Sequence, residues 1–469
     1  MLPTPAPTTA PPSAPSAPGA GRGAELALLG LALVLSVAGY ALGTLGMTGA
    51  LPDDLPVYAA TLAVPALVVH GVVRWRAPHA DPLVLPVVVA LNGTGLAMIH
   101  RLDLARIANG REGEFAGRQL GWSAVSVVLA CLVLVLLRDH RVLRRYSYTA
   151  MAAGLVLLVL PMAPVIGATI NGSRVWVRAF GMSFQPSELA KLALAVFFAG
   201  YLVTHRDNLT LTGRRVLGLH LPRLRYLAPL LVVWAVSLGV MFAQRDLGSS
   251  LLLFGIFVAM LYVATERISW IVLGLGLAGA QVAVAASHFG YVQARFDVWL
   301  HALDPDIFER HPGGSGQLVR GLFGMADGGL LGRGWGQGRP DLVPYAESDF
   351  IMASLGEELG LTGVAALLVL SLLLCQRGLR TAIGLRDGFG KLLAAGLSFG
   401  IALQCFIVLG GITRLIPLTG LTMPFLAYGG SSLVVNWVVA AVLLRLSDRA
   451  RRPAPAEEPD RGRDAVAAG

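Results

Sequence analysis

Long apolar runs recur along most of the chain, and polar residues gather in the segments between them. A helix needs about 20 apolar residues to cross the hydrocarbon core of a bilayer. The runs therefore predict twelve transmembrane helices, at residues 25–47, 56–74, 81–100, 119–137, 147–167, 186–204, 226–243, 247–264, 269–288, 350–375, 391–411 and 422–445. Apolar and polar residues do not alternate in segments of about 10, as they do in a transmembrane β-barrel. The predicted fold class is an all-α polytopic membrane protein.

Three segments outside these runs set the expected organisation. Residues 1–23 are rich in proline, alanine, serine and threonine, and residues 447–469 are charged, so both ends are expected to be disordered tails. The loops between the predicted helices are short, except for residues 289–349. A connector of this length is unusual in a compact protein, which favours a functional role for it.

The composition agrees with a membrane protein. Hydrophobic residues make up 55% of the chain and charged residues only 14%, against about 25% in a typical soluble domain. The mean hydropathy is +0.67. The three cysteines, Cys131, Cys375 and Cys405, lie inside apolar runs without metal-type spacing, so they are interpreted as small buried hydrophobic residues.

The distribution of arginine predicts the orientation of the chain. A net charge of +9 could indicate nucleic-acid binding, but in a membrane protein it is better explained by arginines that set the topology. If the N-terminus is cytoplasmic, the predicted cytoplasmic side holds most of the Lys and Arg residues, as the positive-inside rule requires. Both termini are therefore expected in the cytoplasm, with the 289–349 loop outside.

The stretch at residues 344–363 concentrates carboxylates at the mouth of an apolar run. They are Glu347, Asp349, Glu357 and Glu358. Ser348 or Asp349 is expected to N-cap the helix that follows. A spacing of eight residues places Asp349 and Glu357 near one helical face. A cap accounts for one carboxylate, and the others at membrane depth need a different explanation.

Two further charged pairs interrupt apolar runs. Glu188 and Lys191 are three residues apart and share one helical face, either as a structural ion pair or as the lining of a polar cavity. Spacing alone favours the ion pair. Arg245 and Asp246 lie in a short predicted turn, where Asp246 is expected either to cap the next helix or to belong to a functional site.

Two stretches rich in glycine or proline predict irregular backbone near these charges. Residues 321–349 are rich in glycine, which lets backbone N–H groups approach a polar ligand closely. Residues 416–438 contain Pro417, Pro424 and the run Gly429–Ser432, which interrupt a helix. Broken helices in membranes are tolerated where they line a cavity or are buried in protein. This stretch is therefore a second indication of an internal polar site.

These motifs together resemble the SEDS family (shape, elongation, division and sporulation), whose members include RodA, FtsW and SpoVE. The similar motifs, in the family's order, are NGSRVWV (171–177) with FQPSELAKL (184–192), QRDLGSSLL (244–252), GGLLGRGWGQG (328–338), ESDFIMASLGEELGLTG (347–363) and PLTGLTMPFLAYGGSS (417–432). The resemblance covers about residues 81–446 and is closer to RodA-type than to FtsW-type members. It implies a core of ten transmembrane helices, with two added N-terminal helices in residues 24–80.

The resemblance implies a peptidoglycan glycosyltransferase of the plasma membrane. Such enzymes polymerise lipid II, an undecaprenyl-diphosphate-linked disaccharide-pentapeptide, on the outer face, with a class B penicillin-binding protein as the crosslinking partner. The family's essential aspartate corresponds to Asp349, and its Glu/Lys pair corresponds to Glu188 and Lys191, which strengthens the cavity interpretation of that pair. The chain departs from the family at Arg245, where proline is common, and at Glu347–Ser348, where His-Thr is common.

Glycosyl transfer from a lipid diphosphate requires a base and cations. Asp349 is the candidate general base, and the α-linked donor would be inverted to a β-linked product. The candidate substrate-binding residues are Glu188, Lys191, Arg174, Arg178, Gln244, Arg245, Asp246, Ser348, Glu357, Glu358, Ser431 and Ser432. A divalent cation, Mg²⁺ or Mn²⁺, can accompany the substrate diphosphate, although the sequence contains no dedicated metal site.

Two other classes of function stay open at this stage. Buried charges and broken helices also suit a secondary transporter or a lipid II flippase, although the chain shows no internal repeat. The third class is a non-catalytic cell-wall scaffold. Neither the role in elongation, division or sporulation nor the identity of the transpeptidase follows from the sequence.

Overall fold

A computed structural model describes residues 21–164, 166–170, 172–179, 182–210, 215–216, 219–220, 224–310 and 313–453. The tails predicted at residues 1–23 and 447–469 lie mostly outside these ranges. Their inner ends are helical, because the first helix begins at Arg22 and the last continues to Arg451.

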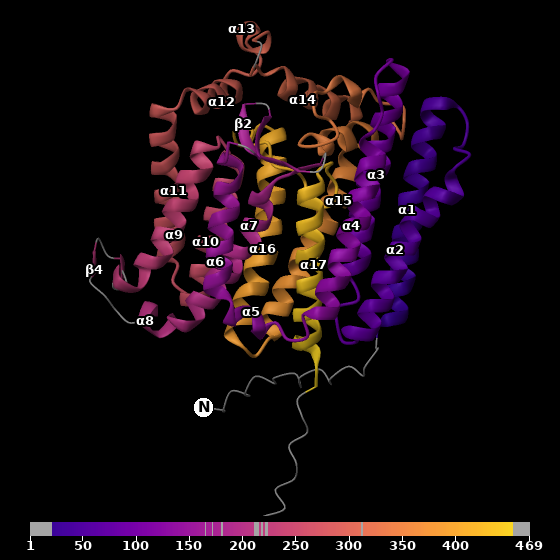
Figure 1. Cartoon of the computed structure of the whole chain (residues 1–469). Helices are drawn as coiled ribbons and strands as arrows, with labels where there is room; N and C mark the ends of the chain where they lie inside the picture. Colours follow the sequence, from indigo (N-terminus) through magenta and orange to yellow (C-terminus); the bar gives the residue numbers. More distant parts are fainter. Residues whose placement is uncertain are drawn as a thin grey trace, which may run out of the picture.

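Helices of membrane length form the body of the protein (Figure 1). Ten helices in the described part are long and apolar enough to cross a bilayer, namely α1 (Arg22–Thr48), α2 (Leu55–Arg76), α3 (Val84–Ala108), α4 (Phe115–Leu136), α7 (Pro186–Thr204), α10 (Leu247–Thr265), α11 (Ser269–His288), α15 (Ile351–Gly384), α16 (Gly388–Ile412) and α17 (Gly430–Arg451). Shorter apolar stretches lie in α6 (Ser147–Val159) and α9 (Leu224–Ala243). The chain is a multi-pass helical membrane protein.

Short elements complete the structure at the two ends of the bundle. They are α5 (Arg141–Arg145), η1 (Leu160–Met162), β1 (Gly167–Ile170), β2 (Ser173–Ala179), β3 (Met182–Phe184), α8 (Arg206–Thr210), β4 (Arg215–Val216), β5 (Leu219–His220), α12 (Gly290–Leu300), α13 (Pro305–Phe308), α14 (Gly316–Gly328) and η2 (Pro340–Leu342). Strands β1, β2 and β3 form an antiparallel sheet in that order, and β4 pairs with β5.

The protein is helical as predicted, and the short strands are elements that the sequence analysis did not predict. A continuous helix was expected over residues 147–167, but α6 ends at Val159 and is followed by a short 3-10 turn that contains Pro161. Proline has no N–H to donate, so the helical hydrogen bonds cannot continue through it. The chain then turns back into β1 and β2, which bring Arg174 to the end of the bundle.

Two other segments contain features that the sequence analysis did not specify. The long 289–349 loop contains the helices α12, α13 and α14. The helix predicted over residues 422–445 begins only at Gly430, and residues 413–429 contain no regular helix. Pro424 and the Gly429–Gly430 pair explain the late start, since both disfavour a continuous helix.

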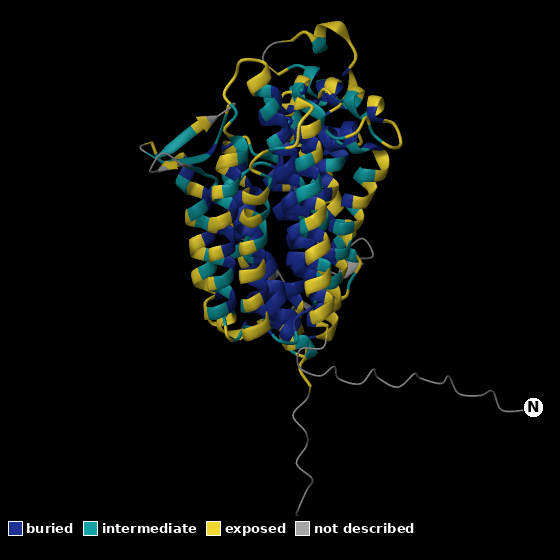
Figure 2. Cartoon of the chain, turned by 90° about the vertical axis from the view of Figure 1, so that its right-hand side faces the viewer, coloured by how far each residue is buried: buried dark blue, intermediate teal, exposed yellow. Residues whose placement is uncertain are grey.

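Burial distinguishes central helices from peripheral ones. In α17 the buried share of the apolar span is 94% and in α3 it is 89%, whereas in α11 it is 17%. Figure 2 shows buried residues along the inside of the bundle and exposed residues along its outer surface. The exposed surface includes large apolar side chains such as Leu31, Val34, Val128 and Leu275, as expected for helices that face lipid.

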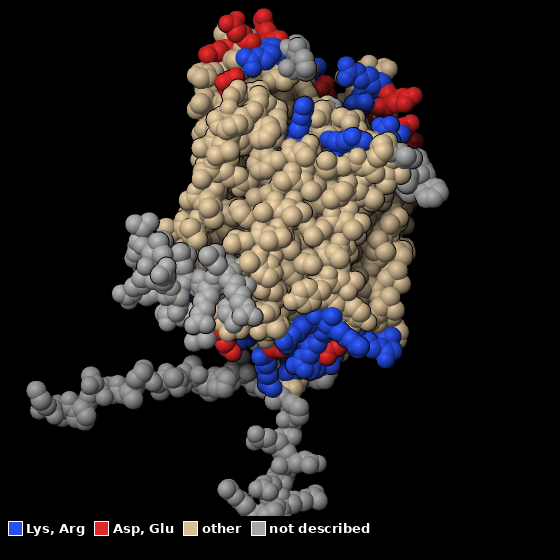
Figure 3. Space-filling view, turned by 60° about the vertical axis from the view of Figure 1, so that its left-hand side comes forward, with Lys and Arg blue, Asp and Glu red and all other residues tan. Residues whose placement is uncertain are grey.

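Charged side chains gather at the two ends of the bundle, and Figure 3 shows a broad uncharged band between them. One end, here called the loop end, carries β1–β3 and α12–α14. The other, the termini end, carries α5, α8 and both ends of the described chain (Figure 1). An uncharged band between two charged ends is the pattern expected when a bilayer surrounds the middle of the protein.

At the loop end, residues 328–339 form an irregular segment, here called the glycine loop, that is held against α15. Glu358 forms a buried ion pair with Arg101 of α3, and its second oxygen accepts a hydrogen bond from Gly336 N at 3.0 Å. Glu357 accepts a hydrogen bond from Arg339 N. The backbone N–H groups of Arg333 and Gly334 bond to the carbonyls of residues 357 and 358, at 3.0 and 2.9 Å.

The ion pair between Arg101 and Glu358 is therefore expected to stabilise this end of the bundle. Arg101→Met leaves the carboxylate of Glu358 buried without a cation, and breaking a buried pair in this way costs about 3–5 kcal/mol. Thermal unfolding of the purified protein in detergent should show a clearly lower Tm. Arg101→Met combined with Glu358→Gln should recover part of the loss.

The matched control is the ion pair between Arg333 and Asp327, in which both side chains are about half exposed. Arg333→Met removes a cation from the same loop, but exposed ion pairs contribute little. We expect the Tm of this variant to stay close to that of the wild type. An equal fall in Tm for both arginine variants would contradict the role given to Arg101.

Candidate active site

Asp349 lies in the turn before α15, at the loop end of the bundle. Its Oδ1 accepts a hydrogen bond from Ser348 Oγ at 3.1 Å, and its Oδ2 accepts one from Gln317 Nε2 of α14 at 3.4 Å. The prediction that Ser348 or Asp349 caps the helix is wrong. The N-cap residue of α15 is Phe350, which makes no side-chain capping bond. The Asp349 carboxylate is therefore free for another role.

Burial makes Asp349 a stronger base than an exposed aspartate. Loss of hydration raises the pKa of Asp349 to about 6, and the nearby carboxylate of Glu347 adds to the rise. The hydrogen bonds from Ser348 and Gln317 act in the opposite direction, because they stabilise the ionised form. A carboxylate with a pKa near 6 is still ionised at neutral pH and can accept a proton more readily than an ordinary aspartate.

A half-buried cation that the sequence analysis did not select lies near Asp349. Arg295 of α12 donates a hydrogen bond from Nη1 to the carbonyl of Leu418 at 2.6 Å. Burial lowers the pKa of Arg295, while the neighbouring Asp246, Tyr291 and Asp349 raise it. Arg295 thus interacts electrostatically with two carboxylates that lie far apart in sequence. In the sequence, no motif distinguishes Arg295 from the many other arginines of the chain.

The turn between α9 and α10 places Asp246 beside α12. Asp246 caps α10 by accepting a hydrogen bond from Ser249 N at 2.9 Å. A cap was one of the two roles predicted for this residue. Its other oxygen is buried and has no hydrogen-bond partner among the described residues. Arg245 has a left-handed backbone (φ 62°), and its guanidinium lies 5.6 Å from the ring centre of Tyr291. This turn therefore presents a cation and a partly unsatisfied carboxylate.

Two of the remaining candidates, Gln244 and Arg174, link this turn to β2 and to the chain before the sheet. The side chain of Gln244 donates a hydrogen bond to the backbone carbonyl of Leu158. The backbone carbonyl of Gln244 accepts a hydrogen bond from Arg174 N at 3.2 Å. The Arg174 side chain donates to the carbonyl of Ala163. Arg178 is exposed on β2. None of these three side chains contacts Asp349 in the described structure.

Glu188 and Lys191 form the ion pair that their spacing predicts. Lys191 Nζ donates to Glu188 Oε1 at 2.9 Å, and both side chains are almost fully buried near the start of α7. The residue before this helix, Gln185, donates its N–H to Ser431 Oγ of α17 at 2.7 Å. The start of α7 and the start of α17 therefore meet. Ser432 accepts hydrogen bonds from Thr422 and Asn436.

The irregular segment at residues 413–429, here called the crossing segment, joins these motifs. Its Tyr428 N–H donates to the carbonyl of Glu347 at 2.8 Å. Leu418 accepts the hydrogen bond from Arg295, and the side chain of Leu421 packs against Gly248 at the start of α10. Phe425 is buried with a left-handed backbone (φ 65°), a strained conformation for a residue with a side chain. Strain of this kind is common at functional sites.

Glu357 and Glu358 make buried contacts with other parts of the loop end. Both are bound to the glycine loop, and Glu358 is also paired with Arg101. The structure adds contacts that hold the glycine loop, and the role of both residues in substrate binding stays a prediction. Spacing within α15 could not reveal these contacts, because the partners come from α3 and from the loop.

No group of three or more His, Cys, Asp or Glu side chains that could hold a metal ion occurs among the described residues.

Comparison with known proteins identifies the family. The model of the FtsW/RodA/SpoVE family, described as cell cycle protein, matches residues 82–452. The peptidoglycan glycosyltransferase RodA of Mycobacterium tuberculosis is 47% identical over 436 residues, with 92% of each chain covered. A probable peptidoglycan glycosyltransferase FtsW of Trichlorobacter lovleyi is 32% identical, with 80% of this chain and 94% of that protein covered.

A solved structure supports the fold. The chain is similar to one from a study of the structural coordination of polymerization and crosslinking by a peptidoglycan synthase complex, with a TM-score of 0.62, 24% identity, and coverage of 79% of this chain and 98% of that one. The resemblance noted from the motifs is confirmed, as is the greater similarity to RodA than to FtsW. The chain belongs to the FtsW/RodA/SpoVE family, which is the SEDS family.

Proposed function

We propose that this protein polymerises lipid II into glycan strands, with Asp349 as the general base. The reaction class follows from relatives that are nearly half identical along nine-tenths of both chains and are named peptidoglycan glycosyltransferases. The chain is a peptidoglycan glycosyltransferase of this family. The observation that carries our assignment of the base is the carboxylate of Asp349. It does not cap a helix, loss of hydration raises its pKa to about 6, and it lies within electrostatic range of the half-buried Arg295.

The reaction requires one proton transfer and one displacement. Asp349 takes the proton from the attacking sugar hydroxyl of the acceptor, and the hydroxyl oxygen forms a bond to the anomeric carbon of the donor. The bond from that carbon to the lipid diphosphate breaks, and the diphosphate leaves with the bonding electrons. Attack from the side opposite the leaving group inverts the α-linked donor to a β-linked product, so no covalent enzyme intermediate forms.

Cations stabilise the negative charge that develops on the leaving diphosphate. We assign this role first to two arginines near Asp246. Arg295 belongs to α12 and interacts electrostatically with Asp246, and Arg245 lies over the ring of Tyr291 in the same helix. Lys191 is already paired with Glu188, so its charge is partly compensated. We further propose that any Mg²⁺ or Mn²⁺ that takes part arrives with the diphosphate, whose oxygens are suitable ligands.

We also propose a class B penicillin-binding protein as the crosslinking partner. The similar solved chain comes from a complex whose description includes both polymerisation and crosslinking. A glycan strand made by this protein needs such a transpeptidase to join it to the wall.

The proposed orientation is that of a plasma-membrane protein with both termini in the cytoplasm and the active site on the outer face. The ten long helices, together with α6 and α9, would make twelve spans, which agrees with both ends of the described chain lying at the termini end (Figure 1). Arginines of α5 and of the end of α17 also lie there. Positive charge in short loops favours the cytoplasmic side.

Asp349→Asn should abolish polymerisation of lipid II without loss of folding. Asparagine keeps the shape of the side chain but cannot accept the proton, and general-base catalysis contributes about 10²–10⁴-fold. Asp349→Glu should also be severely impaired, because active sites are sensitive to displacements of about 1 Å. The measurement is the rate of glycan-strand formation from labelled lipid II by the purified protein with its transpeptidase partner.

Asp327→Asn is the matched control for this experiment, since Asp327 is an exposed carboxylate of the same region. It should polymerise at the wild-type rate. Strand formation by Asp349→Asn at that same rate would refute the role of Asp349. A wild-type protein that moves lipid II across the bilayer but never polymerises it would favour the flippase alternative.

The orientation can be tested by cysteine labelling in intact cells. Glu309 is exposed near the end of α13, so Glu309→Cys should react with an impermeant maleimide. Arg144 is exposed on α5 at the opposite end, so Arg144→Cys should react only after lysis. Cys375 and Cys405 are buried and Cys131 is half-buried, which keeps the background low. The reverse labelling pattern would place the active site on the cytoplasmic side.

A further inference from the structure

The first two helices lie outside the part of the chain that the family model matches. That match begins at residue 82, whereas α1 and α2 end at Thr48 and Arg76. The RodA relative of M. tuberculosis nevertheless covers 92% of this chain. In the structure α1 packs along α3, and α2 packs against α1 and α4 (Figure 1). The two helices are thus an addition that lies directly against the conserved fold.

One face of α1 is in backbone contact with the glycine loop. A Cβ atom built at Gly46 would lie 2.2 Å from the carbonyl oxygen of Trp335, and one at Gly39 would lie 3.1 Å from Cζ2 of the Trp335 ring. On the loop side, a Cβ at Gly336 would lie 2.7 Å from the carbonyl oxygen of Gly43. Only glycine allows the two segments to approach this closely.

A hydrogen bond and an aromatic cluster complete this contact. Gln337 of the loop donates from Nε2 to the carbonyl of Gly46 at 3.1 Å. The Trp335 ring packs against a small buried cluster that contains Tyr40 of α1 and Ala97 of α3. The loop is therefore enclosed between α1 on one side and Glu357 and Glu358 of α15 on the other.

The position of α1 also affects the ion pair between Arg101 and Glu358. A Cβ at Gly43 would lie 3.5 Å from the Cβ of Arg101, so α1 covers the stem of this arginine. The guanidinium of Arg101 then reaches Glu358, and its Nη2 donates to the carbonyl of Gly338 in the glycine loop. Arg101 is almost completely buried as a result.

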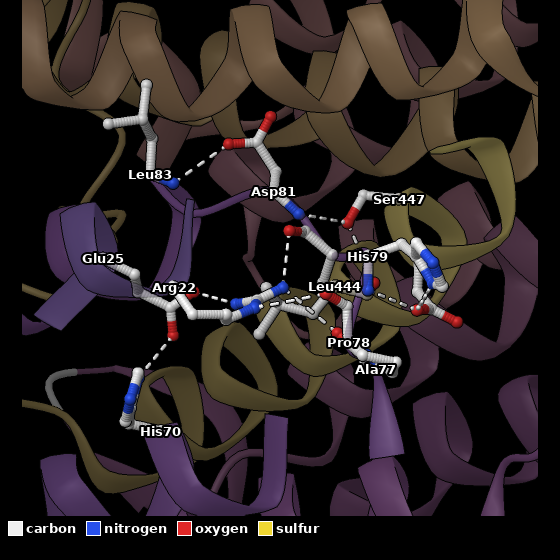
Figure 4. A network of polar contacts seen from close by, with 12 residues as sticks. Arg22, Glu25, His70, Ala77, Pro78, His79, Asp81, Leu83, Leu444 and Ser447 are labelled. Carbon is white, nitrogen blue, oxygen red and sulfur yellow. Dashed lines mark hydrogen bonds and ion pairs between the residues drawn. The ribbon is translucent and has the colours of Figure 1, made fainter. Parts of the chain in front are cut away.

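At the opposite end of the bundle, α1 is fixed by a buried polar network (Figure 4). Arg22 pairs with the fully buried Glu25 and donates to the carbonyls of residues 77, 78 and 80. Glu25 also bonds to His70 of α2 at 2.8 Å. The adjoining Asp81 donates its N–H to Ser447 of α17 at 3.0 Å. Breaking such buried charge contacts is costly, so α1 is held in a fixed axial position.

We propose that α1 is a positioning element for the active site. Its glycine face seats Trp335 and the glycine loop, the loop holds Glu357 and Glu358, and these fix the first turns of the helix that follows Asp349. The proposal rests on the function proposed above for Asp349. Displacement of a reacting group by about 1 Å can lower a rate about 100-fold, so movement of this loop should reach the chemistry.

Gly46→Val in the full-length protein tests this directly, because the new side chain meets backbone atoms of the loop. We expect kcat for lipid II polymerisation to fall about tenfold or more, while KM stays within about twofold, as for an interaction made mainly in the transition state. Hydrogen exchange at the amides of residues 333–339 should become faster. The matched control is Gly30→Val on the exposed side of the same helix, where a Cβ meets nothing within 4 Å, and it should behave as wild type.

A second pair of variants tests the same proposal if Gly46→Val does not accumulate in the membrane. A Cβ at Gly39 meets only side-chain atoms of Trp335 and Ala97, so Gly39→Val is a milder obstacle. It should lower kcat, and the smaller ring of Trp335→Phe in the same chain should restore most of the loss.

Two results would overturn the proposal: wild-type kcat in Gly39→Val, or a loss in Gly30→Val equal to that in the loop-facing variants. Failure of the proposed function would be recognised separately, as wild-type kcat in Asp349→Asn.

Discussion

Irregular backbone inside a membrane protein must find hydrogen-bond partners within the protein, and this requirement organises the active-site region. Each unsatisfied N–H or carbonyl in such a setting costs several kcal/mol. The crossing segment at residues 413–429 meets the requirement with partners from several helices. Gln119 of α4 bonds to the carbonyl of Ala427 and the N–H of Gly429, and Gln404 of α16 bonds to the carbonyl of Thr422. Arg295 and Trp299 of α12 bond to the carbonyls of residues 418 and 414.

These bonds explain why motifs far apart in sequence converge. The hydrogen bond that holds residue 418 also places Arg295 within electrostatic range of Asp246 and Asp349. The bond from Tyr428 to Glu347 ties the turn that carries Asp349 to the same segment. The start of α17, just after the segment, meets the start of α7 through the hydrogen bond from Gln185 N to Ser431 Oγ, and Lys191 lies further along α7. The hydrogen bonds that the crossing segment requires thus also determine where the acidic and basic groups of the proposed chemistry lie.

Short sequence patterns correctly predicted the interactions between residues that are close together in the chain. The spacing of Glu188 and Lys191 correctly predicted their ion pair, and Asp246 caps α10 as one of the predicted alternatives proposed. Local spacing does not reveal contacts with partners that lie far away in the sequence. Glu357 and Glu358 bind the glycine loop and Arg101, and Arg295 gains its place only through α12 and residue 418. The sheet after α6 was missed because the apolar run continues past Val159 although Pro161 ends the helical pattern.

The central claim is that Asp349, a half-buried aspartate with a raised pKa, accepts the proton in the chemical step. The most direct measurement is the pH dependence of kcat/KM for lipid II polymerisation, since it reports the pKa of the essential base in the free enzyme. Because the pKa of Asp349 is raised to about 6, activity should increase with pH through about 6 and level off above it. Any residual activity of Asp349→Asn should lack this step. A wild-type profile without a step near pH 6, or one that persists unchanged in Asp349→Asn, would contradict the account.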